Sequence, residues 1–301
     1  MAASFGPELH LGLVEGHRLV RNPLIWLAGM LTAVWAGVFR PSLNLDQDRY
    51  ILSVGYALAV LGFVAILHTM LAVLRSRSYR TDELLDVLPI GPDRRTIGHA
   101  LAALAGGEIA AGATAAIVAM RGLEPSGRPW DASIEGSPTV PQVDIAQLLQ
   151  GPLAIGVGCL FVVAVAQWMP SWLIIVPVFV LTVFQIIVFG IWFAVETDSP
   201  LTWLWPVSSG VVHDGWTGCG PVGDVCELQV RGFDQTTPSW HLAYLAALCA
   251  WLVMVAVFRH RRDRRTWTLF GASSTLVVVL GFVQIALAKD FGDLVDQVAA
   301  R

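Results

Sequence analysis

Long apolar stretches alternate with short charged stretches along the whole chain. A helix needs about 20 apolar residues to cross the hydrocarbon of a bilayer, because each residue advances it by about 1.5 Å. Seven stretches come close to this length, and they predict an all-α integral membrane protein with about six or seven transmembrane helices. The predicted spans are Pro23–Phe39, Tyr50–Leu74, Ile97–Met120, Leu153–Met169, Leu173–Val195, His241–Phe258 and Trp267–Ala288.

The segment before the first span has a different pattern. From Pro7 to Asn22, Glu15 and Arg18 belong to one polar stripe at 100° per residue, and apolar residues lie away from it. This predicts an amphipathic helix in the membrane interface, and the chain enters the bilayer at Pro23, a residue type favoured in the first turn of a helix. The chain is therefore divided into an N-terminal interfacial element, 1–22, and a transmembrane domain, 23–301.

A charged segment, 75–96, separates the second and third spans. Its five arginines cannot lie in hydrocarbon, so it faces water. Within it Thr81 suits a helix N-cap and Pro89 ends the helix, which predicts one short amphipathic helix. One interpretation is that this helix presents an apolar face to a cytosolic partner. The other is that the segment is a solvated loop resting on the bilayer surface. The candidate docking residues are Asp82, Glu83, Leu84, Leu85 and Leu88.

The distribution of basic residues predicts the orientation. With the N-terminus inside, 12 of the 19 basic residues fall on the cytoplasmic side, mostly in short loops beside helix ends. Basic residues concentrate on that side of cell membranes, so we expect a multi-pass protein of the plasma membrane with a cytoplasmic N-terminus. The segment up to Arg21 also lacks the apolar core of a secretory signal peptide.

This orientation makes 196–240 a large extracellular loop. Cys219 and Cys226 lie within it among several glycines, and an oxidising compartment favours a disulfide between them over two free thiols. His213 is the only histidine in the loop, and no second cysteine pair accompanies the first, so a metal site is disfavoured.

Composition excludes several functions. Only 14% of the residues are charged, and the net charge of −4 gives no support for a nucleic-acid ligand. Lys289 is the single lysine, and because no glycine-rich loop precedes it, the chain has no phosphate-binding loop of its own. No HExxH motif or nucleophile–base pair was found within the spans, so an enzyme is not expected. The chain itself should therefore need no cofactor or metal.

Glu108 is the one acidic residue well inside a predicted span. An ionised carboxylate near the bilayer middle is costly, so the group should be neutral, paired or exposed to a wet cavity. One interpretation is a cavity-lining group that contacts substrate or a proton. The other is a buried carboxyl satisfied by a neighbouring helix, through Thr114, His68 or a backbone carbonyl. The candidate cavity residues are Glu108, His68 and Gln185.

The order of these features resembles the permease subunits of ABC exporters with ABCG-like architecture. The motifs that carry the resemblance are E-x-x-R-x-x-R-N-P-L from Glu15, R-x-R-x-x-x-T-D-E-L-L-x-x-L-P from Arg75, and D-R-R-T from Asp93. The resemblance implies that the N-terminal helix, with Arg18 and Arg21, is an elbow helix. It also implies that 75–96 carries a coupling helix. A seventh span departs from the six common in such permeases.

The resemblance further implies a function and its partners. We expect a permease that moves a hydrophobic or amphipathic substrate across the cell membrane, paired with a second copy or a sister permease among the membrane lipids. A separate ABC ATPase chain would bind ATP and Mg²⁺ and dock on 75–96. The alternative is a non-transporting structural or sensory subunit that binds a cytosolic partner through the same segment. A secondary carrier would predict internal repeats, and no convincing repeat is visible.

Overall fold

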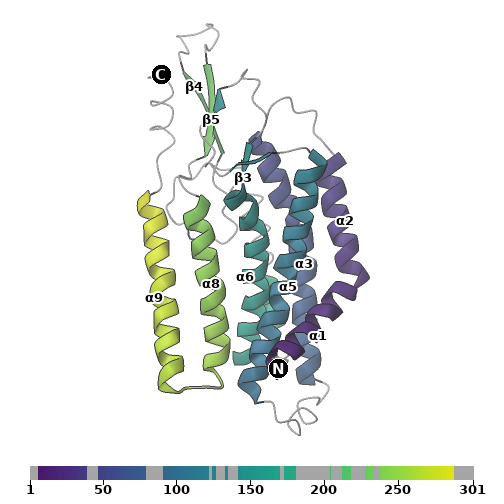
Figure 1. Cartoon of the computed structure of the whole chain (residues 1–301), viewed down its shortest axis with the longest axis vertical. Helices are drawn as coiled ribbons and strands as arrows, with labels where there is room; N and C mark the ends of the chain where they lie inside the picture. Colours follow the sequence, from purple (N-terminus) through teal and green to yellow (C-terminus); the bar gives the residue numbers. More distant parts are fainter. Residues whose placement is uncertain are drawn as a thin grey trace, which may run out of the picture.

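The computed structural model describes residues 6–38, 47–78, 91–121, 124–126, 133–134, 142–169, 173–180, 204, 212–217, 228–233 and 238–287. In this part of the chain the helices stand side by side as a bundle, with short strands beyond one end (Figure 1). The helices are α1 (Pro7–Arg21), α2 (Pro23–Val38), α3 (Gln47–Ser78), α5 (Pro92–Arg121), α6 (Ile145–Trp168), α8 (Pro238–Phe258) and α9 (Arg264–Leu287).

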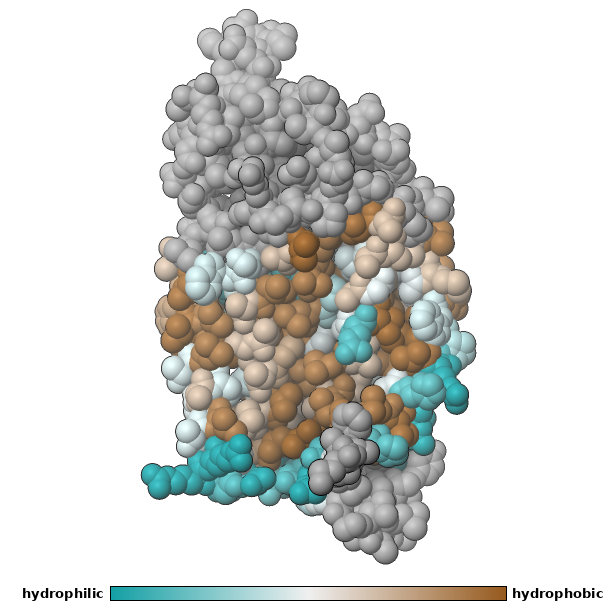
Figure 2. Space-filling view, viewed as in Figure 1, coloured by the Kyte–Doolittle hydropathy of each residue, from teal (hydrophilic) through white to brown (hydrophobic). Residues whose placement is uncertain are grey.

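Four of the described helices, α5, α6, α8 and α9, are long and apolar enough to cross a membrane. Shorter apolar stretches occupy Pro23–Val34 in α2 and Val60–Arg75 in α3. The side chains of these helices form a broad apolar band across the face of the bundle shown in Figure 2. A helical fold with several candidate spans is therefore confirmed. The fifth predicted span, Leu173–Val195, lies mostly outside the described residues, so the number of spans stays a prediction.

The start of α6 corrects a predicted boundary. The sequence pattern starts this span at Leu153, but the helix begins at Ile145 and runs through Pro152. Proline removes one backbone donor, which apolar helices tolerate where neighbouring helices compensate. Here α5 lies close by, because a Cβ added at Gly107 would be 2.9 Å from the Pro152 carbonyl oxygen. The helix therefore continues through Pro152 at a point where α5 and α6 approach closely.

Short strands lie in two connections, one between α5 and α6 and one between residue 180 and α8. β1 (Glu124–Ser126) pairs in parallel with β3 (Gln142–Asp144). A second sheet has the order β2 (Ser133–Ile134), β5 (Leu228–Phe233), β4 (Val212–Thr217), and both of its pairings are antiparallel. The pairing of β2 with β5 joins two loops that are far apart in sequence, which supports their placement at the same end of the bundle.

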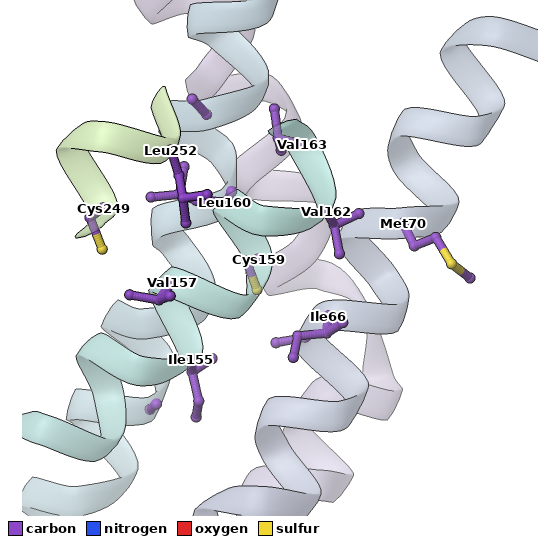
Figure 3. Close-up of a cluster of buried hydrophobic side chains, with 14 of the residues drawn as sticks. Ile66, Met70, Ile155, Val157, Cys159, Leu160, Val162, Val163, Cys249 and Leu252 are labelled. Atoms are coloured by element: carbon purple, nitrogen blue, oxygen red, sulfur yellow. The ribbon is translucent and has the colours of Figure 1, made fainter. Parts of the chain in front are cut away.

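The core is centred on α6. It packs against α3, α5 and α8, and its side chains Cys159, Leu160 and Val162 are almost fully buried. Figure 3 shows these residues between Ile66 from α3 and Leu252 from α8. Because α6 contacts three other helices, it fixes their relative positions.

Candidate functional site

The first part of the candidate site is the contact between α1 and the beginning of α5. A Cβ added at Gly12 would lie 2.9 Å from Leu101 Cβ, and one at Gly98 would lie 2.9 Å from Leu11 Cδ2. A larger residue at either glycine would therefore push the helices apart. The predicted helix at Pro7–Asn22 is confirmed, and it is closely docked on the bundle. The glycines of α1 were the available signal for this docking.

Asn22 joins α1 to both α2 and α3. Its Oδ1 accepts a hydrogen bond from the backbone N–H of Leu24 at 3.0 Å and so caps the first turn of α2. Its Nδ2 donates to Nδ1 of His68 on α3 at 2.8 Å. His68 therefore holds the junction between α1 and α2 and does not pair with Glu108. The sequence pattern gave no signal for this contact, because the two residues are 46 positions apart.

Glu108 lies on an exposed face of α5. On the opposite face Gly106 and Ala110 are buried in the bundle, and the Thr114 hydroxyl donates to the Ala110 carbonyl at 2.9 Å. On the Glu108 face a Cβ added at Gly112, one turn further on, would meet nothing within 4 Å. Figure 2 shows one hydrophilic patch within the apolar band, over the surface where α5 lies in Figure 1. Thr114 and His68 have other hydrogen-bond partners, and Glu108 is exposed on the surface of the described helices.

The two elbow arginines are at the C-terminal end of α1. Arg18 and Arg21 are both exposed, and Arg18 Nη1 forms an ion pair with Glu15 Oε1 at 2.5 Å on the same helix. Basic residues in the last turn of a helix interact favourably with its dipole. These arginines therefore stabilise the end of α1 and remain available on its surface.

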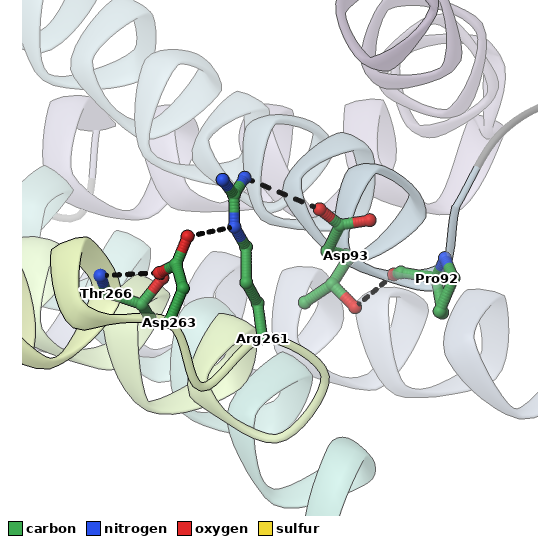
Figure 4. A network of polar contacts seen from close by, with 6 residues as sticks. Pro92, Asp93, Arg261, Asp263 and Thr266 are labelled. Atoms are coloured by element: carbon green, nitrogen blue, oxygen red, sulfur yellow. Dashed lines mark hydrogen bonds and ion pairs between the residues drawn. The ribbon is translucent and has the colours of Figure 1, made fainter.

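A polar network connects α5 to the turn between α8 and α9. We name residues 259–265 the arginine turn. Arg261 donates from Nε to Asp263 Oδ2 at 2.9 Å, and its Nη1 lies 3.8 Å from Asp93 Oδ2 at the start of α5 (Figure 4). The hydroxyl and backbone N–H of Thr266 donate to Asp263 and, together with Arg261, lower the pKa of this carboxyl from 3.8 to about 2. The network therefore caps the beginning of α9 and brings Arg261 within ion-pair distance of the beginning of α5.

Other predicted site residues lie outside the described part of the chain. Within segment 75–96 the structure describes α3 up to Ser78 and the chain again from Gly91. Within the described residues, no group of three or more His, Cys, Asp or Glu side chains could hold a metal ion. The predictions that lie outside are the docking residues Asp82, Glu83, Leu84, Leu85 and Leu88, the cavity residue Gln185, and the disulfide residues Cys219 and Cys226.

The chain matches no protein-family model, no curated protein and no solved structure. The resemblance to ABC permeases therefore rests on the order of motifs along the sequence alone. Membership of that family stays a prediction.

Proposed function

We propose that the chain is the permease subunit of an ATP-driven exporter in the plasma membrane, with its N-terminus in the cytoplasm. It moves a hydrophobic or amphipathic substrate, and a separate ATPase chain binds ATP and Mg²⁺. The observation that supports this most is the docking of α1 on α5 together with the bond from Asn22 to His68 on α3. Segment 75–96, the predicted docking site of the ATPase, runs from the last turn of α3 to the first turn of α5.

A movement of segment 75–96 is transmitted directly to the bundle. The segment continues from α3 and leads into α5, and both helices are held by the N-terminal element through Gly98 and His68. The ion pair between Asp93 and Arg261 extends the same connection to α9. An ATPase that pushes on this segment would therefore tilt several helices together, as alternating access requires.

Glu108 supports a pathway between two permeases. It is exposed on α5 near the middle of a candidate span, and hydrocarbon is an unfavourable environment for a carboxylate. A second copy or a sister permease facing this side of α5 would enclose Glu108 in a polar cavity. There the carboxyl can hydrogen-bond to a substrate or exchange a proton.

The decisive experiment is co-purification from the native membrane in mild detergent, with ATPase subunits identified by peptide mass spectrometry and ATP hydrolysis. We expect the native chain to retain the ATPase and the variant Leu84→Asp/Leu88→Asp to lose it. The matched control is Ile145→Asp/Leu149→Asp, which places the same charges four residues apart at exposed sites on α6. This control should keep the ATPase, because it lies near the strands at the opposite end of the bundle (Figure 1).

The outcomes separate the two candidate functions. Retention by the native chain and the control, with loss from a folded Leu84→Asp/Leu88→Asp variant, supports the exporter and its docking face. Absence of any ATPase from the native preparation contradicts the exporter. The non-transporting subunit that binds another cytosolic partner through 75–96 would then be preferred.

The extracellular placement of 196–240 has its own test. Thr217 and Leu228 are opposite each other in the β4–β5 register, and Cys219 and Cys226 are each two positions beyond them. We propose that these cysteines form a disulfide. Alkylation of the denatured chain without reductant should then modify only Cys159 and Cys249, which are free and buried in the native structure. All 4 cysteines should react after reduction. Modification of all of them without reductant would contradict both the disulfide and the oxidising compartment.

A further inference from the structure

The arginine turn carries a dense positive charge at the ends of two candidate spans. Its seven residues include five arginines and a single acid, Asp263, and all are exposed. Figure 2 shows this region as a hydrophilic edge directly below the apolar band. Such a cluster beside a membrane-crossing helix is suited to anionic ligands.

The turn is a fixed scaffold. Asp263 accepts the backbone N–H of Thr266 at 2.8 Å, which caps the first turn of α9, and it also binds Arg261. His260 forms a 2.9 Å hydrogen bond with Gln167 at the end of α6. The only acid of the turn is therefore already engaged, and the positive charge of the other arginines is not neutralised within the turn.

Two of the remaining arginines lie over aromatic rings. The Arg259 guanidinium is 5.5 Å from the ring centre of Trp168, and that of Arg262 is 5.9 Å from the ring centre of Phe258. Cation–π contacts of this kind orient the guanidinium without neutralising its charge. Both groups are therefore held at the boundary between the apolar helix ends and water.

The beginning of α9 adds two arginines and an apolar anchor. Arg264 and Arg265 lie in its first turn, where the helix dipole is already positive, so the helix itself gains nothing from them. Trp267 is 55% exposed and packs edge-on against Phe258 at 4.5 Å. Only 11% of the most apolar stretch of α9 is buried inside the chain, so lipid can reach this side. The guanidinium groups lie toward water and the exposed indole lies toward the apolar helix. This is the order in which a phospholipid places its phosphate and its acyl chains.

We propose that the arginine turn binds the phosphate headgroups of anionic phospholipids in the cytoplasmic leaflet. Arg259 and Arg262 contact the phosphate, Arg264 and Arg265 supply further positive charge, and Trp267 packs against the upper acyl chains. The exposed apolar neighbours favour a lipid over an acidic protein surface. The inference rests on the membrane placement in the proposed function and does not depend on export.

The test is a lipid titration of the purified full chain in neutral detergent, read by native mass spectrometry. Phosphatidylglycerol and phosphatidylcholine with identical acyl chains are compared for the native chain and for Arg259→Gln/Arg262→Gln. We expect the native chain to prefer phosphatidylglycerol, and the variant to bind it about 30-fold more weakly, since each basic residue near an anionic surface contributes about fivefold. Phosphatidylcholine binding should not change.

The control variant is Arg18→Gln/Arg21→Gln, which removes two exposed arginines from α1. It should retain the preference for phosphatidylglycerol. Equal weakening of phosphatidylglycerol binding in both variants would show a general electrostatic attraction by all basic residues, and it would overturn the site. Equal affinity of the native chain for the two lipids would overturn it as well. Displacement of the lipid by millimolar inorganic phosphate would show that the site takes free phosphate instead.

A single substitution serves as a second variant. If Arg259→Gln/Arg262→Gln fails to fold, the single change Arg265→Gln should weaken phosphatidylglycerol binding about fivefold. No ATPase is present in the titration, so failure of the lipid site leaves the exporter proposal untouched. A variant that keeps phosphatidylglycerol but loses a co-purifying ATPase would make the turn a protein-docking surface and would overturn the lipid proposal.

Discussion

The helices α6 and α9 are closely matched in sequence character and very different in environment. Their candidate spans have 21 and 23 residues and similar hydropathy. Yet 67% of the most apolar stretch of α6 is buried within the chain, against 11% for α9. Hydropathy therefore identifies a helix that can cross a bilayer, but it does not show whether that helix forms the core or the periphery.

The two helices are also held by different interactions. The backbone of α6 lies close to that of α5: a Cβ added at Gly107 would be 2.9 Å from the Pro152 carbonyl oxygen. α9 is connected to α8 by specific polar bonds: His241 Nδ1 to Gln284 Oε1 at 3.0 Å, and Trp251 Nε1 to the Ser274 hydroxyl at 3.1 Å. In a bilayer, packing and such hydrogen bonds hold helices together, because lipid tails are as apolar as the helices themselves. The stability of the core around α6 should therefore depend on side-chain volume. The association of α9 with α8 should depend on the polar side chains between them.

The largest expected difference comes from adding volume. Gly107→Leu should lower the free energy of unfolding by about 1–3 kcal/mol, because overpacking would force α5 away from the backbone of α6. Gly271→Leu on α9 should cost nothing, since a Cβ there would meet nothing within 4 Å. Thermal unfolding in detergent, followed by size-exclusion chromatography, compares the two. Equal losses of stability would contradict the division into core and periphery.

A smaller effect is expected from the polar bonds of α9. Gln284→Leu removes the bond to His241 and should destabilise the association of α9 with α8 by about 0.6 kcal/mol, up to about 1.7. Thr275→Val is the matched control, because Thr275 is exposed on the same helix and its replacement has nearly the same shape. Cysteine cross-linking between α8 and α9 measures the association. A Thr275→Val effect as large as that of Gln284→Leu would show that the bond has no special role.

The smallest effect concerns pH at the arginine turn. The pKa of Asp263 is lowered from 3.8 to about 2, so its contribution to stability is present above about pH 4 and is lost as the pH falls through 2. Asp263→Asn cannot titrate. Acid should therefore reduce the unfolding temperature of the native chain slightly more than that of the variant. Parallel unfolding curves for both chains between pH 7 and 2, measured in detergent, would contradict this contribution.

Some elements were predictable because their signals are local. The helix at Pro7–Asn22 and the new start at Pro23 follow from a polar stripe and a proline, and the structure has α1 and α2 at these positions. The fourth span was predicted from Leu153, whereas the candidate span in the structure starts at Leu148 and its helix α6 at Ile145, because the helix continues through Pro152. The strands of the two loops were not predicted, since β2 pairs with β5 about 100 residues further along the chain.

The residues of the candidate site also include some that local sequence signals identify and some whose environment depends on distant contacts. Residue type and depth alone single out Glu108 as an unusual group, but only the packing of α5 shows that it faces outward. His68 was named as a candidate cavity residue and possible partner of Glu108, and the structure shows a hydrogen bond between His68 and Asn22. A hydrogen bond between distant residues has no counterpart in hydropathy or spacing, which explains the difference.

The sequence by itself determined which stretches can enter a bilayer, where charge forbids it, and that its single lysine, Lys289, follows no glycine-rich loop. These properties follow from the solvation of individual side chains and need no knowledge of neighbours. Only the tertiary structure decided that α6 is central and α9 peripheral, that α1 is docked through glycines, and that Asp93 meets Arg261. Each of these depends on contacts between residues far apart in the chain, which form only when the helices pack.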